Sequence, residues 1–267
     1  MLYDINKRCF SYILFGMILI LVSGFLVYRT KKSNIVTTFS PLIRQVENTR
    51  ISYMTDDYPY VMTEHFIIRY DEGIDRDILD LVEKTAEEKY NQMVEIFNYQ
   101  VSNKILIVLY NDVEELKKNT MLKEYPPPMG VYYANSIHLL NPRYWIEEEN
   151  LEKVFYSQGP MLHELAHLFV DHIAKGNYPA WFTEGVSLYL EYEVDGYQWG
   201  EEVDLKEEEY TLEILTNKFH QLDEYLAYTQ SFRIIKKFVS EKGMKSLIDI
   251  IKALGEGNDI QNFISLF

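Results

Sequence analysis

The sequence predicts an α+β fold in which a small mixed sheet is followed by two adjacent helices and a helical C-terminal part. Three observations support this prediction. Short apolar runs typical of strands precede residue 141, apolar residues recur every three to four positions in the segments after it, and a long uncharged run opens the chain. We divide the 267 residues into an N-terminal membrane anchor at 1–32, a juxtamembrane linker at 33–62 and one compact domain at 63–267.

The N-terminal segment is predicted to be a transmembrane helix, because Phe10–Tyr28 contains nineteen uncharged residues in a row. At about 1.5 Å per residue, this run covers roughly 30 Å of hydrocarbon. Basic residues flank it on both sides, so the charge rule does not fix its orientation. We expect a retained single-pass anchor with the following domain outside the cytoplasm. Cleavage near Val22-Ser23-Gly24 is the alternative.

The charge of the chain excludes nucleic acid as a partner. The net charge is −15, and residues 33–267 carry −19 because the first 32 residues hold five basic side chains and one acidic. Nine acidic residues lie between Glu191 and Glu209, where they could attract basic peptides, form a solvated loop or bind calcium. Cys9 is the single cysteine, so the chain has no disulfide framework.

The first half of the domain is predicted to build the sheet. Strands are expected at 65–70, 104–110, 130–133 and 136–140, from their β-branched and aromatic residues and their flanking turns. An amphipathic helix is expected near 75–97, and Asp112 is expected to cap a short helix. The run Pro126-Pro127-Pro128 breaks the chain. No internal repeat is apparent.

The motif His163-Glu164-Leu165-Ala166-His167 lies within apolar residues that recur every three to four positions from Val154 to Ile173. This spacing predicts one long amphipathic helix. Residues four apart on a helix are offset by about 6 Å along its axis, so both imidazoles can bind one zinc ion. Glu164 stands beside that space, where it can act as a general base without binding the metal.

Two histidines leave a zinc ion without a third protein ligand, and the next helix offers one. Residues 179–191 predict a helix with Pro179 in its first turn. The short connection at Gly176 and Asn177 favours an antiparallel neighbour, which can bring Glu184 level with the two histidines. We therefore expect His163, His167 and Glu184 to be the zinc ligands.

These residues resemble the gluzincin metallopeptidases, and most closely the peptidase MA-like domains of small bacterial proteins. In that family an H-E-L-x-H motif is followed by Pro-Ala-Trp-x-x-Glu-Gly, which is similar to His163–His167 and Pro179–Gly185 here. The segment Tyr228-Thr229-Gln230-Ser231-Phe232 also resembles a Tyr-x-Gln-Ser motif of such domains. The resemblance spans about residues 64 to 267. It implies a zincin-like fold, an extracytoplasmic location and a Zn²⁺ cofactor.

The resemblance further implies hydrolysis of peptide bonds by zinc-bound water that Glu164 activates. Tyr228 is the candidate donor to the oxyanion of the transition state. In gluzincins an edge strand binds the extended substrate, and residues 130–133 or 136–140 are expected to do so. Many gluzincins place an Asp four residues after the Glu ligand to orient a histidine. Leu188 stands there instead, so Asp171 or Glu191 is expected to take that role.

Two alternatives remain at the level of sequence. The chain could be a membrane-tethered binding or sensing protein with a structural zinc or an inactive peptidase fold. Glu164 argues against this reading, because a closed structural site has no use for a carboxylate beside an open position. An aminopeptidase would resemble relatives with a Gly-Ala-Met-Glu-Asn strand, which this sequence lacks. We therefore expect an endopeptidase with a peptide or protein substrate.

Overall fold

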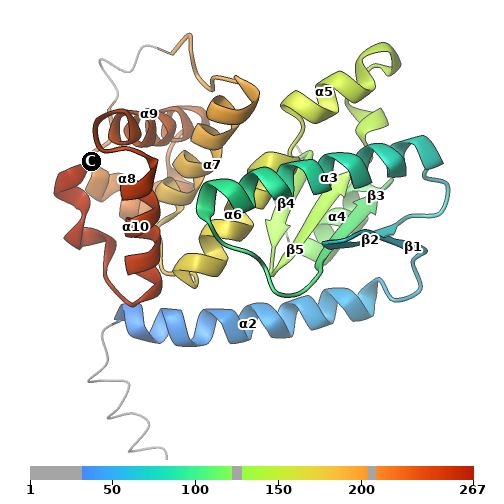
Figure 1. Ribbon diagram of the computed structural model, residues 1–267, viewed down its shortest axis with the longest axis horizontal. Helices are drawn as coiled ribbons and strands as arrows, with labels where there is room; N and C mark the ends of the chain where they lie inside the picture. The colour runs from blue at the N-terminus through green and yellow to red at the C-terminus, as the bar shows by residue number, and fades with distance from the viewer. Residues whose placement is uncertain (1–31, 122–127, 204–208) are drawn as a thin grey trace, which may run out of the picture.

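The sheet has five strands and lies between two layers of helices. The computed structural model describes residues 32–121, 128–203 and 209–267, and its strands follow the order β1-β2-β3-β5-β4 (Figure 1). Strands β2 (Phe66–Tyr70), β3 (Ile105–Tyr110) and β5 (Ser136–Leu140) are parallel. The edge strands β1 (Tyr60–Met62) and β4 (Gly130–Tyr133) are antiparallel to their neighbours. The predicted mixed sheet is thus confirmed, with β1 as an additional strand.

The side chains of β3 alternate between the two faces of the sheet, and all six of its residues are buried. Ile105, Ile107 and Leu109 face α3 (Arg76–Phe97) and α6 (Met161–Ala174), in the larger part of the core. Leu106, Val108 and Tyr110 face a smaller core made with α2 (Lys32–Met54) and α4 (Val113–Thr120). A strand with both faces covered needs apolar residues throughout, which explains its continuous apolar sequence.

Two predicted helix starts are found where the sequence placed them. Asp75 stands at the N-cap position of α3, and the side chain of Asp112 accepts a hydrogen bond from the backbone N–H of Glu114 at the start of α4, at 2.8 Å. The long helix predicted from Val154 to Ile173 is wrong in one respect. It is two helices, α5 (Leu151–Gln158) and α6, separated by Gly159 and Pro160. Proline has no N–H to continue the ladder and disfavours helical backbone at the residue before it.

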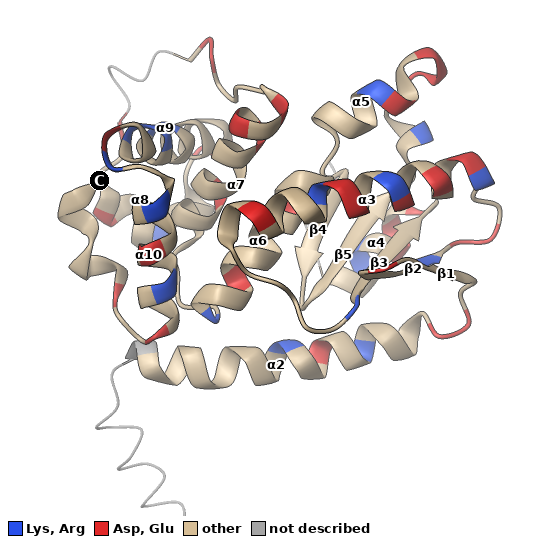
Figure 2. Cartoon of the chain, viewed as in Figure 1, with Lys and Arg blue, Asp and Glu red and all other residues tan. Residues whose placement is uncertain are grey.

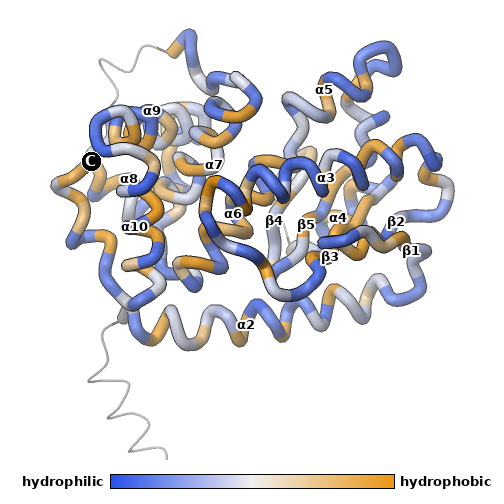
Figure 3. The backbone as a smooth tube through the Cα atoms, viewed as in Figure 1, coloured by the Kyte–Doolittle hydropathy of each residue, from blue (hydrophilic) through white to orange (hydrophobic). Residues whose placement is uncertain are grey.

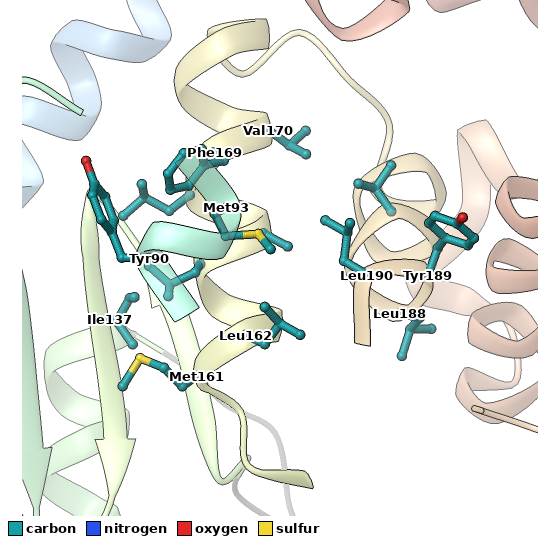
Figure 4. Packing of buried hydrophobic residues seen from close by; sticks show 14 of the residues in the cluster. Tyr90, Met93, Ile137, Met161, Leu162, Phe169, Val170, Leu188, Tyr189 and Leu190 are labelled. Carbon is teal, nitrogen blue, oxygen red and sulfur yellow. The ribbon is translucent and has the colours of Figure 1, made fainter. Parts of the chain in front are cut away.

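The C-terminal part is helical, as predicted. It contains α7 (Ala180–Asp195), α8 (Leu212–Lys218), α9 (Glu224–Lys242) and α10 (Met244–Gly255). Five short 3₁₀ turns complete the described structure: Pro142–Tyr144, Glu148–Asn150, Phe219–Gln221, Ile260–Asn262 and Ile264–Leu266. Between the sheet and these helices, α6 is packed on both sides. Its Leu162 and Phe169 lie near Met93 of α3, while Leu188 and Leu190 belong to the neighbouring α7 (Figure 4).

The predicted juxtamembrane linker contains a helix. Helix α2 runs along the outside of the domain, below the sheet in Figure 1, and buries Ile51 against the smaller core. The predicted anchor at Phe10–Tyr28 and two prolines of the predicted break, Pro126 and Pro127, lie outside the described residues. Among the helices that are described, none has the length and apolar character needed to cross a bilayer.

Candidate metal centre

Helix α6 carries both histidines of the motif on one face. The ring centroids of His163 and His167 lie 4.7 Å apart. The opposite face of α6 is anchored in the core by Leu162, Leu165 and Phe169, which are almost fully buried. A helix packed in this way holds its polar side chains in fixed positions, as a metal site requires.

Helix α7 brings Glu184 to the two histidines. Oε2 of Glu184 lies 3.3 Å from Nε2 of His163 and 3.4 Å from Nε2 of His167. The next residue, Gly185, explains how α7 is placed, since a Cβ there would stand 2.5 Å from the backbone oxygen of Ser231 in α9. Only glycine permits the two helices to approach this closely. The structure thus brings together the three side chains that the sequence predicts as zinc ligands.

The donor set fits a zinc ion. One ligand atom from each of His163, His167 and Glu184 lies within 4.8 Å of the other two. Oε2 of Glu184 is buried, and it accepts no hydrogen bond from any group in the described structure. An orphaned buried carboxylate oxygen is unfavourable unless a cation or donor satisfies it. Two imidazole nitrogens and a carboxylate oxygen, with a position left for water, are the ligands of catalytic zinc sites.

The charges of the three groups perturb one another. Burial disfavours the ionised form of Glu184, but the positive charges of His167 and His163 outweigh burial and lower the pKa of this carboxyl. Burial also disfavours a charged His163, but the carboxylates of Glu191 and Glu184 outweigh it and raise the pKa of this imidazole. These carboxylates therefore favour a positive charge beside them, which a divalent metal ion can supply.

Each histidine has a partner at its second ring nitrogen. Nδ1 of His163 lies 3.2 Å from Oε2 of Glu191, and Nδ1 of His167 lies 2.7 Å from the hydroxyl oxygen of Thr183. Such contacts fix the ring orientation and leave Nε2 free to bind metal. Glu191 lies seven residues, or about two helical turns, after Glu184 on α7, so it faces the same side. Of the two residues predicted to orient a histidine in place of Leu188, Asp171 and Glu191, the structure places Glu191 beside His163. Thr183 was not predicted from the sequence, although it directly precedes the Glu ligand.

Glu164 lies between the metal centre and the edge of the sheet. Its Oε2 accepts a hydrogen bond of 2.6 Å from the backbone N–H of Tyr132 in β4. Burial raises the pKa of Glu164, against the opposing effects of His163, His167 and the Tyr132 N–H. A carboxylate with a raised pKa and one fixed donor suits a general base at neutral pH. Of the two strands predicted to bind substrate, β4 is the one at the sheet edge, and β5 is interior.

Asp171 is placed elsewhere than at a histidine nitrogen. Its Oδ2 accepts a hydrogen bond of 2.7 Å from the hydroxyl of Tyr132, and it forms an ion pair with Arg44 of α2. Asp171 is almost fully buried, and Arg44 is mostly buried. Asp171 therefore joins three elements, α2, β4 and α6, and its link to the metal centre runs through Tyr132 and Glu164.

Tyr228 lies in the first turns of α9, close to Glu184. Burial, followed by the charge of Glu184 and a hydrogen bond to it, raises the pKa of the Tyr228 hydroxyl. The hydroxyl therefore stays protonated at neutral pH and can donate a hydrogen bond. Its ring packs 5.5 Å from that of Phe219 and 6.2 Å from that of Trp199, which limits its movement.

The remaining histidines lie away from this centre. His138 is buried in the smaller core, where its ring nitrogens lie 2.8 Å from the hydroxyl of Tyr110 and 2.9 Å from that of Ser136. Burial lowers the pKa of His138 to about 3, so this histidine is neutral. Within the described ranges, the His163, His167 and Glu184 group is the only one that brings together three residues of the types that bind metals.

Comparison with known proteins identifies the family. The family model of the peptidase MA superfamily matches residues 85–266, a range that contains the motif, α7 and α9. A search of curated proteins finds no significant match. Domains of this superfamily are peptidases and are usually zinc-dependent. The matched range covers more than half of the chain, and we conclude that the chain belongs to the peptidase MA superfamily.

Proposed function

We propose that this protein is a zinc-dependent endopeptidase. The observation that supports the proposal most strongly is the convergence of His163, His167 and Glu184, with Glu164 held beside them by the edge strand. In this reading the three converging residues bind Zn²⁺ and Glu164 is the general base. When bound, the zinc ion supplies a Lewis acid that polarises a carbonyl and lowers the pKa of water to about 7.

Glu164 moves the proton in the proposed reaction. Its carboxylate takes a proton from the attacking water and later delivers a proton to the leaving amine. Before substrate binds, the hydrogen bond from the Tyr132 N–H holds Oε2 of this carboxylate against β4. The raised pKa of Glu164 brings its proton affinity closer to what a transfer at neutral pH needs.

Tyr228 is the proposed donor to the developing oxyanion. Its side chain is half-buried and its hydroxyl is protonated and next to Glu184, so it can donate to negative charge that develops beside the ligand set. Removal of one such donor commonly lowers kcat by a factor of about 10² to 10³. We expect Tyr228→Phe to reduce turnover in this range while zinc content stays unchanged.

The edge strand β4 is the proposed peptide-binding strand. Its outer edge has no strand partner in the described structure, and Tyr132 directs a backbone N–H away from β5 toward Glu164. An extended peptide can pair with such an edge through main-chain hydrogen bonds. An internal bond of a long chain can then reach Glu164, which is why we propose an endopeptidase.

We also propose that the N-terminal segment tethers this domain to a membrane, with the catalytic part on the extracytoplasmic side. The support is the uncharged run Phe10–Tyr28, which is long enough to cross a bilayer. Added protease should degrade the domain in intact cells. Protection until the membrane is permeabilised would place the domain in the cytoplasm and refute this orientation.

The test of the proposed activity uses the full chain in detergent. Zinc content and cleavage of a peptide library are measured for the wild type, for Glu164→Gln and for the control Glu213→Gln, an exposed residue of α8. We expect Glu164→Gln to retain zinc and to lose at least about 10²-fold in kcat, and Glu213→Gln to match the wild type. If all three proteins bind zinc but none cleaves a peptide, the binding or sensing alternative is favoured. If Glu164→Gln cleaves as fast as the wild type, Glu164 is not the general base.

A further inference from the structure

Helix α2 has one face fixed to the domain. Ile51 and Thr55 at its C-terminal end are fully buried. Arg44 forms the ion pair with Asp171, and Nδ2 of Asn48 donates a hydrogen bond of 3.0 Å to the backbone oxygen of Ala134. These contacts come from residues on the inner side of the helix, and they set which side faces outward.

The outer face of α2 is apolar and uncovered. Phe39, Leu42, Ile43 and Val46 expose 50%, 60%, 62% and 67% of their surfaces. Their spacing of three and four residues places them on one side of the helix, and Figure 3 shows hydrophobic residues recurring along α2. We call these four residues the α2 stripe. Tyr53, seven residues after Val46 and 84% exposed, continues it.

Charged residues next to the α2 stripe lie only beyond its C-terminal end, where Glu47 and Arg50 form an ion pair with each other. Between Ser33 and Val46 the single charged residue is Arg44, which points inward to Asp171. In Figure 2 the N-terminal half of the described helix is almost entirely tan, and the blue and red of Arg44, Glu47 and Arg50 begin only near its middle. Exposed apolar patches of this kind mark interaction sites.

The neighbouring sequence indicates what covers the stripe. The uncharged run Phe10–Tyr28 ends four residues before α2 begins, and Arg29, Lys31 and Lys32 stand at the junction. Basic residues beside an apolar helix face complement the headgroups of a bilayer with anionic lipid. A second copy of the chain fits less well. Thr38 and Gln45 beside the stripe are neutral, and the charges of Glu47 and Arg50 are paired with each other, so few charges are left to pair across a helix–helix interface.

We propose that α2 lies on the bilayer surface, with the α2 stripe inserted among the headgroups and upper acyl chains. This inference builds on the membrane tether proposed above and adds a second membrane contact. The inner face of the same helix holds Asp171, which binds Tyr132 of β4. Contact of the stripe with lipid therefore fixes the distance and orientation of the edge strand relative to the membrane.

The test uses the full chain in lipid nanodiscs that hold one copy each, with phosphatidylcholine and phosphatidylglycerol as lipids. Cys9→Ser removes the native thiol, and a single cysteine at Leu42→Cys or Val46→Cys carries an environment-sensitive fluorophore. Ser240→Cys, exposed on α9, is the matched control. We expect lipids with a quencher near the headgroup to quench the labels at 42 and 46 at least about threefold more than the label at 240.

Each outcome is decisive for α2. Equal, weak quenching at 42, 46 and 240 in chains that sit in nanodiscs would overturn the proposal while leaving the tether intact. Disulfide cross-linking of two unlabelled Leu42→Cys chains in detergent, together with no lipid quenching of the labelled chain in nanodiscs, would assign the stripe to a second copy instead. Failure of the chain to enter nanodiscs would overturn both the tether and this inference. As a further check, Val46→Glu should abolish the excess quenching at 42, because an ionised carboxylate opposes insertion.

Discussion

Replacement of Glu191 tests whether this residue orients His163 for the metal. The two side chains are mostly buried, with 15% and 16% exposed, so solvent screens their 3.2 Å contact only partly. Two full charges at this distance would interact by about 5 kcal/mol at an effective dielectric of about 20. A metal-bound imidazole is neutral, however, so a smaller effect applies.

Loss of a partner at the second ring nitrogen commonly weakens metal binding by about 10- to 100-fold, or about 1.4 to 2.8 kcal/mol. Glu191→Gln keeps an oxygen acceptor, so its zinc affinity should fall by about 10-fold. Glu191→Ala removes the acceptor, so its zinc affinity should fall by about 100-fold. The assay is competition for zinc between the full chain and a chromophoric chelator at neutral pH.

The matched control for Glu191 is Glu193→Gln on the same helix. Glu193 accepts a hydrogen bond of 3.0 Å from the hydroxyl of Tyr189, so its carboxylate is engaged with a residue that is not a proposed ligand. This variant should bind zinc as the wild type does. If Glu191→Ala also binds zinc with wild-type affinity, Glu191 does not orient His163, and Thr183 at His167 becomes the remaining orienting contact.

Three further predictions concern the scaffold. Lys89→Met leaves the buried Asp195 without its ion-pair partner and should lower the free energy of unfolding, measured by calorimetry, by about 3–5 kcal/mol. The double variant Lys89→Met with Asp195→Leu should recover most of this loss. Gly185→Ala places a Cβ 2.5 Å from the backbone oxygen of Ser231, so it should lower the free energy of unfolding in urea by about 1–3 kcal/mol and weaken zinc binding. An unchanged free energy of unfolding would contradict the close approach of α7 and α9. His138 has a folded-state pKa of about 3 against about 6.5 unfolded, so protons bind the unfolded chain preferentially below pH 6.5, and this residue alone should lower stability by about 2 kcal/mol from pH 7 to pH 5, in addition to any contribution from His172. His138→Gln should remove that part of the pH dependence, and an unaltered slope would show that another group is responsible.

The elements that local sequence specifies were predicted well. Strand β3 has apolar residues on both faces, and Asp112 caps α4, because these signals lie within a few residues of the structure they determine. The convergence of His163, His167 and Glu184 was also predictable. It depends on helical spacing within α6 and on a short antiparallel connection to α7.

Contacts between distant segments could not be predicted. Arg44 and Asp171 lie 127 residues apart, and nothing in the mixed polarity of residues 33–62 indicates that α2 packs against the site. The donor that fixes Glu164 is the backbone N–H of Tyr132, and a backbone group leaves no signal in the choice of residue. The break between α5 and α6 was missed for a different reason. The apolar periodicity continues across Gly159 and Pro160, although proline opposes a continuous helix.

The hydrogen bond between Tyr132 and Glu164 has a consequence for the order of events during turnover. The amide that holds the carboxylate is the same amide that an incoming peptide needs in order to add a strand to β4. In the proposed reaction, an extended chain that pairs with β4 would take over this amide, and Oε2 of Glu164 would be released at the same time. A short ligand that reaches His163, His167 and Glu184 without pairing with β4 would leave the carboxylate of Glu164 hydrogen-bonded to Tyr132.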